Sequence, residues 1–197
     1  MKIYGFATNN VLKVLATAEA LGLDYDYTQL DPMQGEHKTP EHLQRHPRGK
    51  VPVIEEDSEY LYESNTICRY LAAREDSLLY GNSPREKALI DQRVDMITNH
   101  VGSNLGTYFF EDMVKKNYLK LPPSEENLKE AAELLGVSLP LLDDVLEDSA
   151  FLTGDQITIA DTIGFAFCSV TEITSASIDE YKHLKKWYDA MTKRPGI

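Results

Sequence analysis

Lys50-Val51-Pro52-Val53-Ile54, followed shortly by Tyr62-Glu63-Ser64, is the stretch of sequence that decides the fold. A proline inside a short β-branched run cannot donate a hydrogen bond to a neighbouring strand. Pro52 therefore belongs at the start or the edge of a strand, where an X-Pro bond can also be cis. A proline in such a place leaves the neighbouring backbone groups available to a ligand.

The second half of this stretch marks a change from strand to helix. Residues 59–62 have a strand pattern, whereas residues 66–71 have apolar side chains at helical spacing. A helix that opens on Glu63-Ser64 would offer unpaired N–H groups, a hydroxyl and its dipole to an anion. The carboxylate of Glu63 would lie beside these groups and could bind an amine. This combination suits the zwitterionic end of an amino acid.

The first part of the chain alternates between strand and helix patterns. The elements predicted are a strand at 2–5, a helix from Asn9 or Asn10 to just before Gly22, a strand at 25–30, a helix at 40–45, strands at 51–54 and 59–62, and a helix at 65–74. This βαβαββα order predicts a four-stranded mixed sheet covered by helices, the thioredoxin-like plan. We assign residues 1–76 to this domain.

The second part, residues 84–197, has only helical patterns. The earlier pattern breaks at Tyr80-Gly81-Asn82, and Ser83-Pro84 then supplies the N-cap serine and N1 proline of a new helix. The helices predicted run from 84 to the Pro122-Pro123 pair, from Ser124 through a middle bent by Gly136 and Pro140, after a Thr158–Asp161 capping box, and over about 179–193. The fold class is α/β plus all-α.

Composition and charge exclude several classes of function. The 197 residues carry a formal net charge of −12 that is spread along the chain, so nucleic acids and anionic membrane surfaces are not expected partners. The sequence has no signal peptide or membrane-spanning pattern, and we expect a cytoplasmic protein. Cys68 and Cys168 are expected to be buried free thiols. The histidines show no metal-ligand spacing, so no metal is expected.

With Pro52, Glu63-Ser64 and the Thr158–Asp161 cap in place, the chain resembles the cytosolic glutathione S-transferases along nearly its whole length. Residues 35–41 and 46–52 look most like the phi-type glutathione site. The opening Ala7-Thr8-Asn9-Asn10 looks closer to bacterial enzymes with a Thr-Pro-Asn segment, so we compare the chain with bacterial, phi-, nu- or theta-like members. The resemblance implies a cytoplasmic homodimer that conjugates glutathione to hydrophobic electrophiles, as in detoxification.

The resemblance also implies a set of glutathione-binding residues. His37 and Lys38 would hold the glycine carboxylate, and Lys50 would line the same groove. The backbone of Val51, beside Pro52, would pair with the cysteinyl amide. The γ-glutamyl end would then lie at Glu63 and Ser64, which agrees with the independent argument from the helix start.

Catalysis requires a donor that stabilises the thiolate of glutathione. Thr8 aligns with the catalytic serine of related enzymes when Lys13 and Val14 anchor the helix, so we expect Thr8 to act first and Asn10 second. Tyr4 is the alternative, because other classes use a tyrosine near the end of the first strand. No cysteine lies between Tyr4 and Lys13, so glutathione must supply the reacting sulfur.

The second substrate is expected to be apolar and to lie between the domains. It would contact the helix face that carries Tyr108, Phe109, Phe110 and Met113. The chain ends early for the family, at Pro195-Gly196-Ile197, and we expect a more open cleft for that reason.

The sequence is also compatible with two other functions. A glutathione-dependent disulfide or peroxide reductase would use the same groove, with the sulfur attacking sulfur or oxygen instead of carbon. A non-catalytic module of the same fold would bind another protein, as in transferase-like domains of translation factors. We expect a damaged groove in such a module, and Lys50, Glu63 and Ser64 argue against that.

Overall fold

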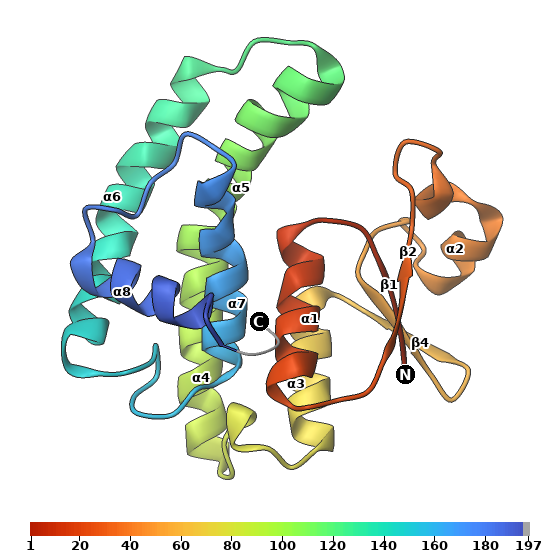
Figure 1. Cartoon of the computed structure of the whole chain (residues 1–197), viewed down its shortest axis with the longest axis horizontal. Helices are drawn as coiled ribbons and strands as arrows, with labels where there is room; N and C mark the ends of the chain where they lie inside the picture. Colours follow the sequence, from red (N-terminus) through yellow and green to blue (C-terminus); the bar gives the residue numbers. More distant parts are fainter. Residues whose placement is uncertain (195–197) are drawn as a thin grey trace. The chain divides into compact units, whose positions relative to one another are not determined.

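A four-stranded mixed sheet forms the centre of the first part of the chain (Figure 1). The computed structural model describes residues 1–194, and these divide into two units, Met1–Ser77 and Leu78–Arg194. The residues 195–197, to which the expectation of a more open cleft refers, lie outside the described part. The two units correspond to the strand-and-helix part and the helical part of the sequence.

The sheet has the predicted mixture of parallel and antiparallel strands. Its strands are β1 (Lys2–Gly5), β2 (Asp26–Gln29), β3 (Val53–Glu56) and β4 (Glu59–Tyr62), in the spatial order β2-β1-β3-β4. Strand β1 runs parallel to β2 and antiparallel to β3, so that Ile3 lies opposite both Tyr27 and Ile54. The strand expected from Val51 begins two residues later, at Val53, because Pro52 has no N–H to donate. The Val51-Pro52 peptide bond is cis.

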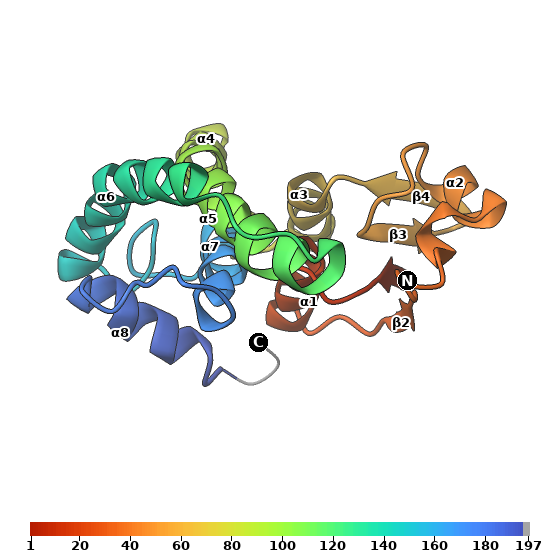
Figure 2. The same cartoon turned by 90° about the horizontal axis from the view of Figure 1, so that it is seen from above.

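Two helices of this unit share one face of the sheet. Helices α1 (Asn9–Ala20) and α3 (Ser64–Arg74) pack side by side there, and the short helix α2 (Pro40–Arg45) lies on the other side, after a 3-10 turn at Glu36–Lys38 (Figures 1 and 2). The core between α1, α3 and the sheet is formed by fully buried aliphatic side chains, namely Ile3, Val14, Ile54, Ile67 and Leu71. The thioredoxin-like βαβαββα order is confirmed.

The second unit consists of helices only. After a 3-10 turn at Leu78–Tyr80, a long helical run comprises α4 (Pro84–Met96), a π-helical segment (Ile97–Gly102), α5 (Ser103–Tyr108) and a second π-helical segment (Phe109–Leu119). The sequence predicts one regular helix here, and the wide π turns are a difference that apolar spacing alone does not reveal. Helix α6 (Glu125–Asp148) continues through Pro140, which leaves the Gly136 carbonyl without its helical donor.

Helix α7 (Ile159–Cys168) is the centre of the second unit, since all ten of its residues are buried. The predicted capping box is present, and the Asp161 carboxylate accepts four hydrogen bonds. The donors are the backbone N–H and hydroxyl of Thr158, the N–H of Leu152 and the indole of Trp187. Burial raises the pKa of Asp161 to about 6, so this carboxylate is charged at neutral pH and needs those donors.

The last helix is shorter than its sequence pattern predicts. After a 3-10 turn at Ser169–Glu172, α8 spans Lys182–Met191 instead of 179–193. A contact with another helix determines where α8 begins, because the Asp143 carboxylate on α6 accepts the backbone N–H groups of His183 and Leu184. Both cysteines are buried, as expected. None of the described helices is long and apolar enough to cross a membrane.

Glu111 joins the end of the long helical run to the start of α6. Its side chain is 1% exposed, and its carboxylate accepts hydrogen bonds from the Lys115 ammonium, the Ser124 N–H and the Asn127 amide, each at 2.7 Å. The bond from Lys115 is the main cause that lowers the pKa of Glu111 from 4.5 to about 2, and the bonds from Ser124 and Asn127 add to it. The native protein therefore keeps this carboxylate charged in acid.

We expect Glu111 to make stability depend on pH. Because its native pKa is below the unfolded value, its contribution is complete above pH 4.5 and is lost as the pH falls toward 2. Glu111→Gln should be less stable at pH 7, and its free energy of unfolding should fall less steeply between pH 5 and pH 2.5. Urea titrations followed by circular dichroism measure this slope. Glu126→Gln, on the exposed side of α6, is the control, and equal slopes for wild type and Glu111→Gln would contradict the assignment.

Candidate functional site

The N-terminus of α1 is formed by Thr8. Its extended backbone (φ −145°, ψ 155°) places the side-chain oxygen 3.2 Å from the N–H of Val11, which it accepts as an N-cap. A hydroxyl that accepts in this way still has its own proton to donate. Thr8 can therefore act both as a cap and as a donor at the positive end of the helix dipole.

Asn10 connects the start of α1 to the start of α3. Its side-chain oxygen lies 2.8 Å from the ammonium of Lys13 and 3.3 Å from the hydroxyl of Ser64. Lys13 is only 2% exposed, and this burial lowers its pKa to about 8. The predicted site residues Thr8, Asn10 and Ser64 thus lie at two helix N-termini that meet.

The start of α3 has an unusual backbone. Glu63, its N-cap residue, has a φ of +72° and a ψ of 106°, a conformation that L residues other than glycine rarely adopt. The Glu63 side chain makes no cap hydrogen bond and is exposed, as a carboxylate available to an amine would be. The first N–H groups of α3 have no intrahelical acceptor and are suited to an anion.

Tyr4 is poorly placed to activate a thiol. Its hydroxyl donates a hydrogen bond to the Glu55 carboxylate, and the Arg45 guanidinium lies 4.1 Å from the centre of its ring. Burial, followed by the bond to Glu55, raises the pKa of Tyr4 to about 12. A proton held in this way is not available to a thiolate, so the geometry favours Thr8 and Asn10 over Tyr4.

The segment from residue 37 to residue 51 forms a basic loop in an acidic chain. The Lys38 ammonium donates to the Arg48 carbonyl at 2.8 Å, and a ring nitrogen of His42 lies 2.9 Å from the Lys50 carbonyl. These bonds join the two halves of the loop. Lys38 and Lys50 remain exposed, so their charges can still attract a carboxylate.

His37 lies in the same loop, with its ring at the edge of Phe6, 5.6 Å between centroids. Burial and then the positive charge of Lys38 lower the pKa of His37, so its imidazole is neutral at pH 7. Its Nδ1 atom is buried and has no hydrogen-bond partner within residues 1–194. A neutral imidazole can bind a carboxylate by donating one N–H.

Val51 and Pro52 link these two groups of residues. Tyr4 on β1 lies opposite Val53 on β3, so the segment before β3 runs beside the segment after β1. Val51 and Phe6 accordingly pack against the same apolar cluster of Tyr4, Leu30 and Val53. All seven residues predicted to bind glutathione therefore belong to the first unit, and Val51 joins the basic loop to the helix starts.

The side chains predicted to form an aromatic face in the second unit differ in how exposed they are. Tyr108 is buried and Phe109 and Met113 are half-buried, whereas Phe110 is 45% exposed. Phe110 is thus the most accessible of the four, which the sequence could not indicate because three adjacent aromatics all look alike. The Asn117 amide donates to the Met113 sulfur at 3.5 Å.

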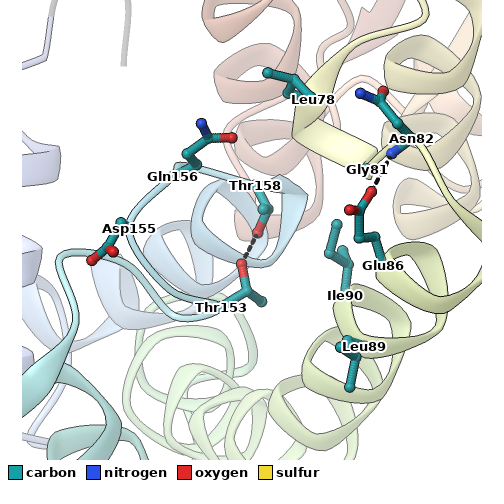
Figure 3. A pocket seen from close by; sticks show the side chains of 10 residues that line it. All are labelled: Leu78, Gly81, Asn82, Glu86, Leu89, Ile90, Thr153, Asp155, Gln156 and Thr158. Carbon is teal, nitrogen blue, oxygen red and sulfur yellow. Dashed lines mark hydrogen bonds between the residues drawn. The ribbon is translucent and has the colours of Figure 1, made fainter.

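A cavity of about 300 Å³ lies within the second unit, away from every predicted site residue (Figure 3). Several of its polar groups already have structural roles. Glu86 accepts the N–H groups of Asn82 and Ser83, and the hydroxyls of Thr153 and Thr158 are 2.9 Å apart. Residues 1–194 contain no cluster of three or more histidine, cysteine or acidic side chains suited to a metal ion.

Comparison with known proteins gives a consistent result. The family models described as "Glutathione S-transferase, N-terminal domain" and "Glutathione S-transferase, C-terminal domain" match residues 1–73 and 103–195. A probable glutathione S-transferase of Oryza sativa subsp. japonica is 30% identical over 200 residues, covering 100% of this chain and 93% of that protein. Elongation factor 1-gamma 1 of the same plant is 32% identical, covering 95% of this chain but 45% of that protein.

A solved structure of a glutathione S-transferase is also similar to this chain. Glutathione S-transferase I from mais, in complex with an atrazine glutathione conjugate, superposes with a TM-score of 0.89 at 28% identity. The match covers 99% of this chain and 93% of that one.

The backbone of Glu63 leads to a stability prediction. A non-glycine residue in such a conformation costs about 1–3 kcal/mol, whereas the flexibility of glycine costs about 0.5–1 kcal/mol relative to alanine. Glu63→Gly should therefore be more stable than Glu63→Ala by about 1 kcal/mol in urea titrations. Both variants lose the carboxylate, so the difference reports the backbone alone.

Thr66, on the exposed face of α3, is the matched control for this pair. There Ala should be more stable than Gly by about 1 kcal/mol, the reverse order. The same order at both positions would show that Glu63 is not strained.

Proposed function

This chain belongs to the glutathione S-transferase family, and we propose that it is a glutathione transferase that acts on small hydrophobic electrophiles. In this reaction the glutathione sulfur, as thiolate, attacks an electrophilic carbon. A carbon–sulfur bond forms, the leaving group departs with its electron pair, and the thiol proton passes to water. The single observation that carries the proposal is the meeting of two helix N-termini at Asn10 and Ser64.

The charges of the first unit suggest how glutathione lies on it. The γ-glutamyl end would bind at Glu63 and Ser64, where an exposed carboxylate can pair with its amine and the α3 N-terminus with its carboxylate. The backbone of Val51, after which Pro52 offers no N–H, would pair with the cysteinyl amide. The glycine carboxylate would lie at His37, Lys38 and Lys50, which support it by charge and by hydrogen bonding.

Thr8 is the proposed thiol activator, with Asn10 as a second donor. Lowering a thiol pKa from about 8.5 by about two units requires about 2.7 kcal/mol. A hydrogen bond to a charged group contributes about 1.5–3 kcal/mol, and a helix N-terminus adds about 0.3–1 kcal/mol. One donor together with the α1 dipole is therefore sufficient, and neither a protein thiol nor a metal ion is required.

The electrophile is proposed to contact Tyr108, Phe109 and Met113, together with the more accessible Phe110. These side chains provide mainly apolar area, which suits varied aromatic or alkyl substrates. Replacement of such residues changes the binding of the electrophile more than that of glutathione. We also propose that the protein is a cytoplasmic homodimer, which is in keeping with its family and with two buried free thiols.

A second candidate function is protein binding without catalysis. The 32% identity to elongation factor 1-gamma 1 is the observation that favours it. Against it stand the polar groups already described, since a module that binds only another protein has no need of the exposed Lys38 and Lys50 or of the exposed Glu63 carboxylate at a helix start. A disulfide or peroxide reductase would use the same glutathione groove and differ only in the atom attacked.

Titration of glutathione tests the proposed activation. Bound glutathione should show thiolate absorbance in the ultraviolet at a pH well below 8.5. Thr8→Ala should lower kcat about 100-fold, as does the loss of one preorganised donor elsewhere, and Asn10→Ala about tenfold. Tyr4→Phe is the matched control and should leave thiolate absorbance unchanged. Near-normal turnover of Thr8→Ala would overturn its role, and binding without a lowered thiol pKa would favour the protein-binding alternative.

The class of reaction is tested with two substrates. We expect an aromatic halide to give a thioether, identified by mass spectrometry, with release of halide. A mixed disulfide should react at least about tenfold more slowly, because the apolar side chains proposed to contact the electrophile suit an aromatic ring better than a polar disulfide. Turnover of the disulfide alone would identify a reductase instead.

A further inference from the structure

The side-chain amide of Asn10 has an orientation that chemistry determines. The Lys13 ammonium, 2.8 Å away, has three donors and no acceptor, so the atom facing it must be the carbonyl oxygen. The Ser64 hydroxyl, 3.3 Å from the same oxygen, must then be the donor in that bond. With its oxygen held twice, Asn10, an exposed residue, presents its NH₂ group away from Lys13.

We propose that Lys13 is a positioning residue for catalysis, which holds the Asn10 amide so that its NH₂ group donates to the thiolate. The inference rests on the proposed function, because it concerns the same thiol. Without Lys13 the Asn10 amide could rotate by half a turn and offer its oxygen instead. An oxygen facing the sulfur would repel the thiolate, whereas an N–H stabilises it.

The surroundings of Lys13 support a role beyond packing. The side chain is 2% exposed, and the two ionisable groups of α3 that act on its charge are Cys68 and Glu63. The pKa of about 8 reflects burial that these two groups only partly offset. Burial of a cation is costly, and an apolar side chain of similar volume is often neutral or stabilising in its place. A function at the site accounts for a charge that packing does not require.

The Ser64 hydroxyl also holds the Asn10 amide in place. Its proton is directed at Asn10, so its oxygen lone pairs are left for the ligand. Ser64 and Lys13 thus hold one oxygen from two helices, and loss of either donor would loosen the same amide. Lys13 is the better test, because Ser64 is also proposed to contact glutathione.

The experiment compares Lys13→Met, Lys13→Arg and Lys2→Met as full-length proteins. Lys13→Met removes the charge and the donor at similar volume, Lys13→Arg keeps both, and Lys2→Met removes an exposed lysine from β1. The readouts are the pKa of bound glutathione from thiolate absorbance against pH, kcat and KM for glutathione, and the melting temperature from circular dichroism.

For Lys13→Met we expect the thiol pKa to rise by about one unit, from about 6.5 to about 7.5, and kcat at pH 7 to fall about threefold, because the ionised fraction of the bound thiol at pH 7 falls from about three quarters to about one quarter. KM for glutathione should change less than about threefold, since its contacts are elsewhere. The melting temperature should be equal to that of wild type or higher. Lys13→Arg should recover most of the lowered pKa, and Asn10→Ala should cost clearly less in the Lys13→Met background than in wild type, because Lys13 acts through Asn10.

Two results would overturn the proposal. The first is a bound thiol pKa in Lys13→Met that equals that of wild type and of Lys2→Met. The second is a loss of activity in Lys13→Met that Lys13→Arg does not recover and that accompanies a lower melting temperature, because this describes a packing role. Failure of the proposed function is distinguishable, since wild type itself would then show no thiolate, and both proposals would fall.

Discussion

The meeting of two helix N-termini on one face of a small sheet is the constraint on which the site depends. Helix α1 begins after β1 with Thr8 as its cap, and α3 begins after β4 at the strained Glu63. Their positive ends repel each other, and the bond between Ser64 and Asn10 holds them together. An anion placed between them relieves that repulsion. The first unit is therefore prepared for a negatively charged ligand before any ligand arrives.

In the second unit, carboxylates have the opposite role, because they complete helix starts within the protein. Asp161, Glu111 and Asp143 each accept backbone N–H groups of a helix N-terminus. Each joins segments that are separate in sequence, and Asp143 does so over forty residues, reaching from α6 to His183. Carboxylates thus accept the N–H groups of these helix starts in the second unit, whereas at the start of α3 the Glu63 side chain makes no cap hydrogen bond.

Elements with local signals were predictable from the sequence, and elements set by distant contacts were not. Pro40 at N1 marked α2, Ser83-Pro84 marked α4, and Thr158 marked α7, each at the observed residue. The start of α8 depends on Asp143, so it could not be found locally, and apolar spacing does not distinguish the π turns from a regular helix. The fold class and the family are confirmed. The site residues stay predictions, although the geometry disfavours Tyr4, whose bond to Glu55 comes from strand pairing.

Lys13 shows why a functional residue can be invisible in a sequence. Three positions after Asn10 on a helix, a lysine has the spacing of an ordinary surface pair. In the structure Lys13 is buried on α1, and the packing of α3 against α1 brings Ser64 to the same Asn10 oxygen. The contact that forms the core of the first unit therefore also orients the donor at its surface. A variant that improves the packing by removing the charge would be expected to harm the chemistry, because the two depend on the same atoms.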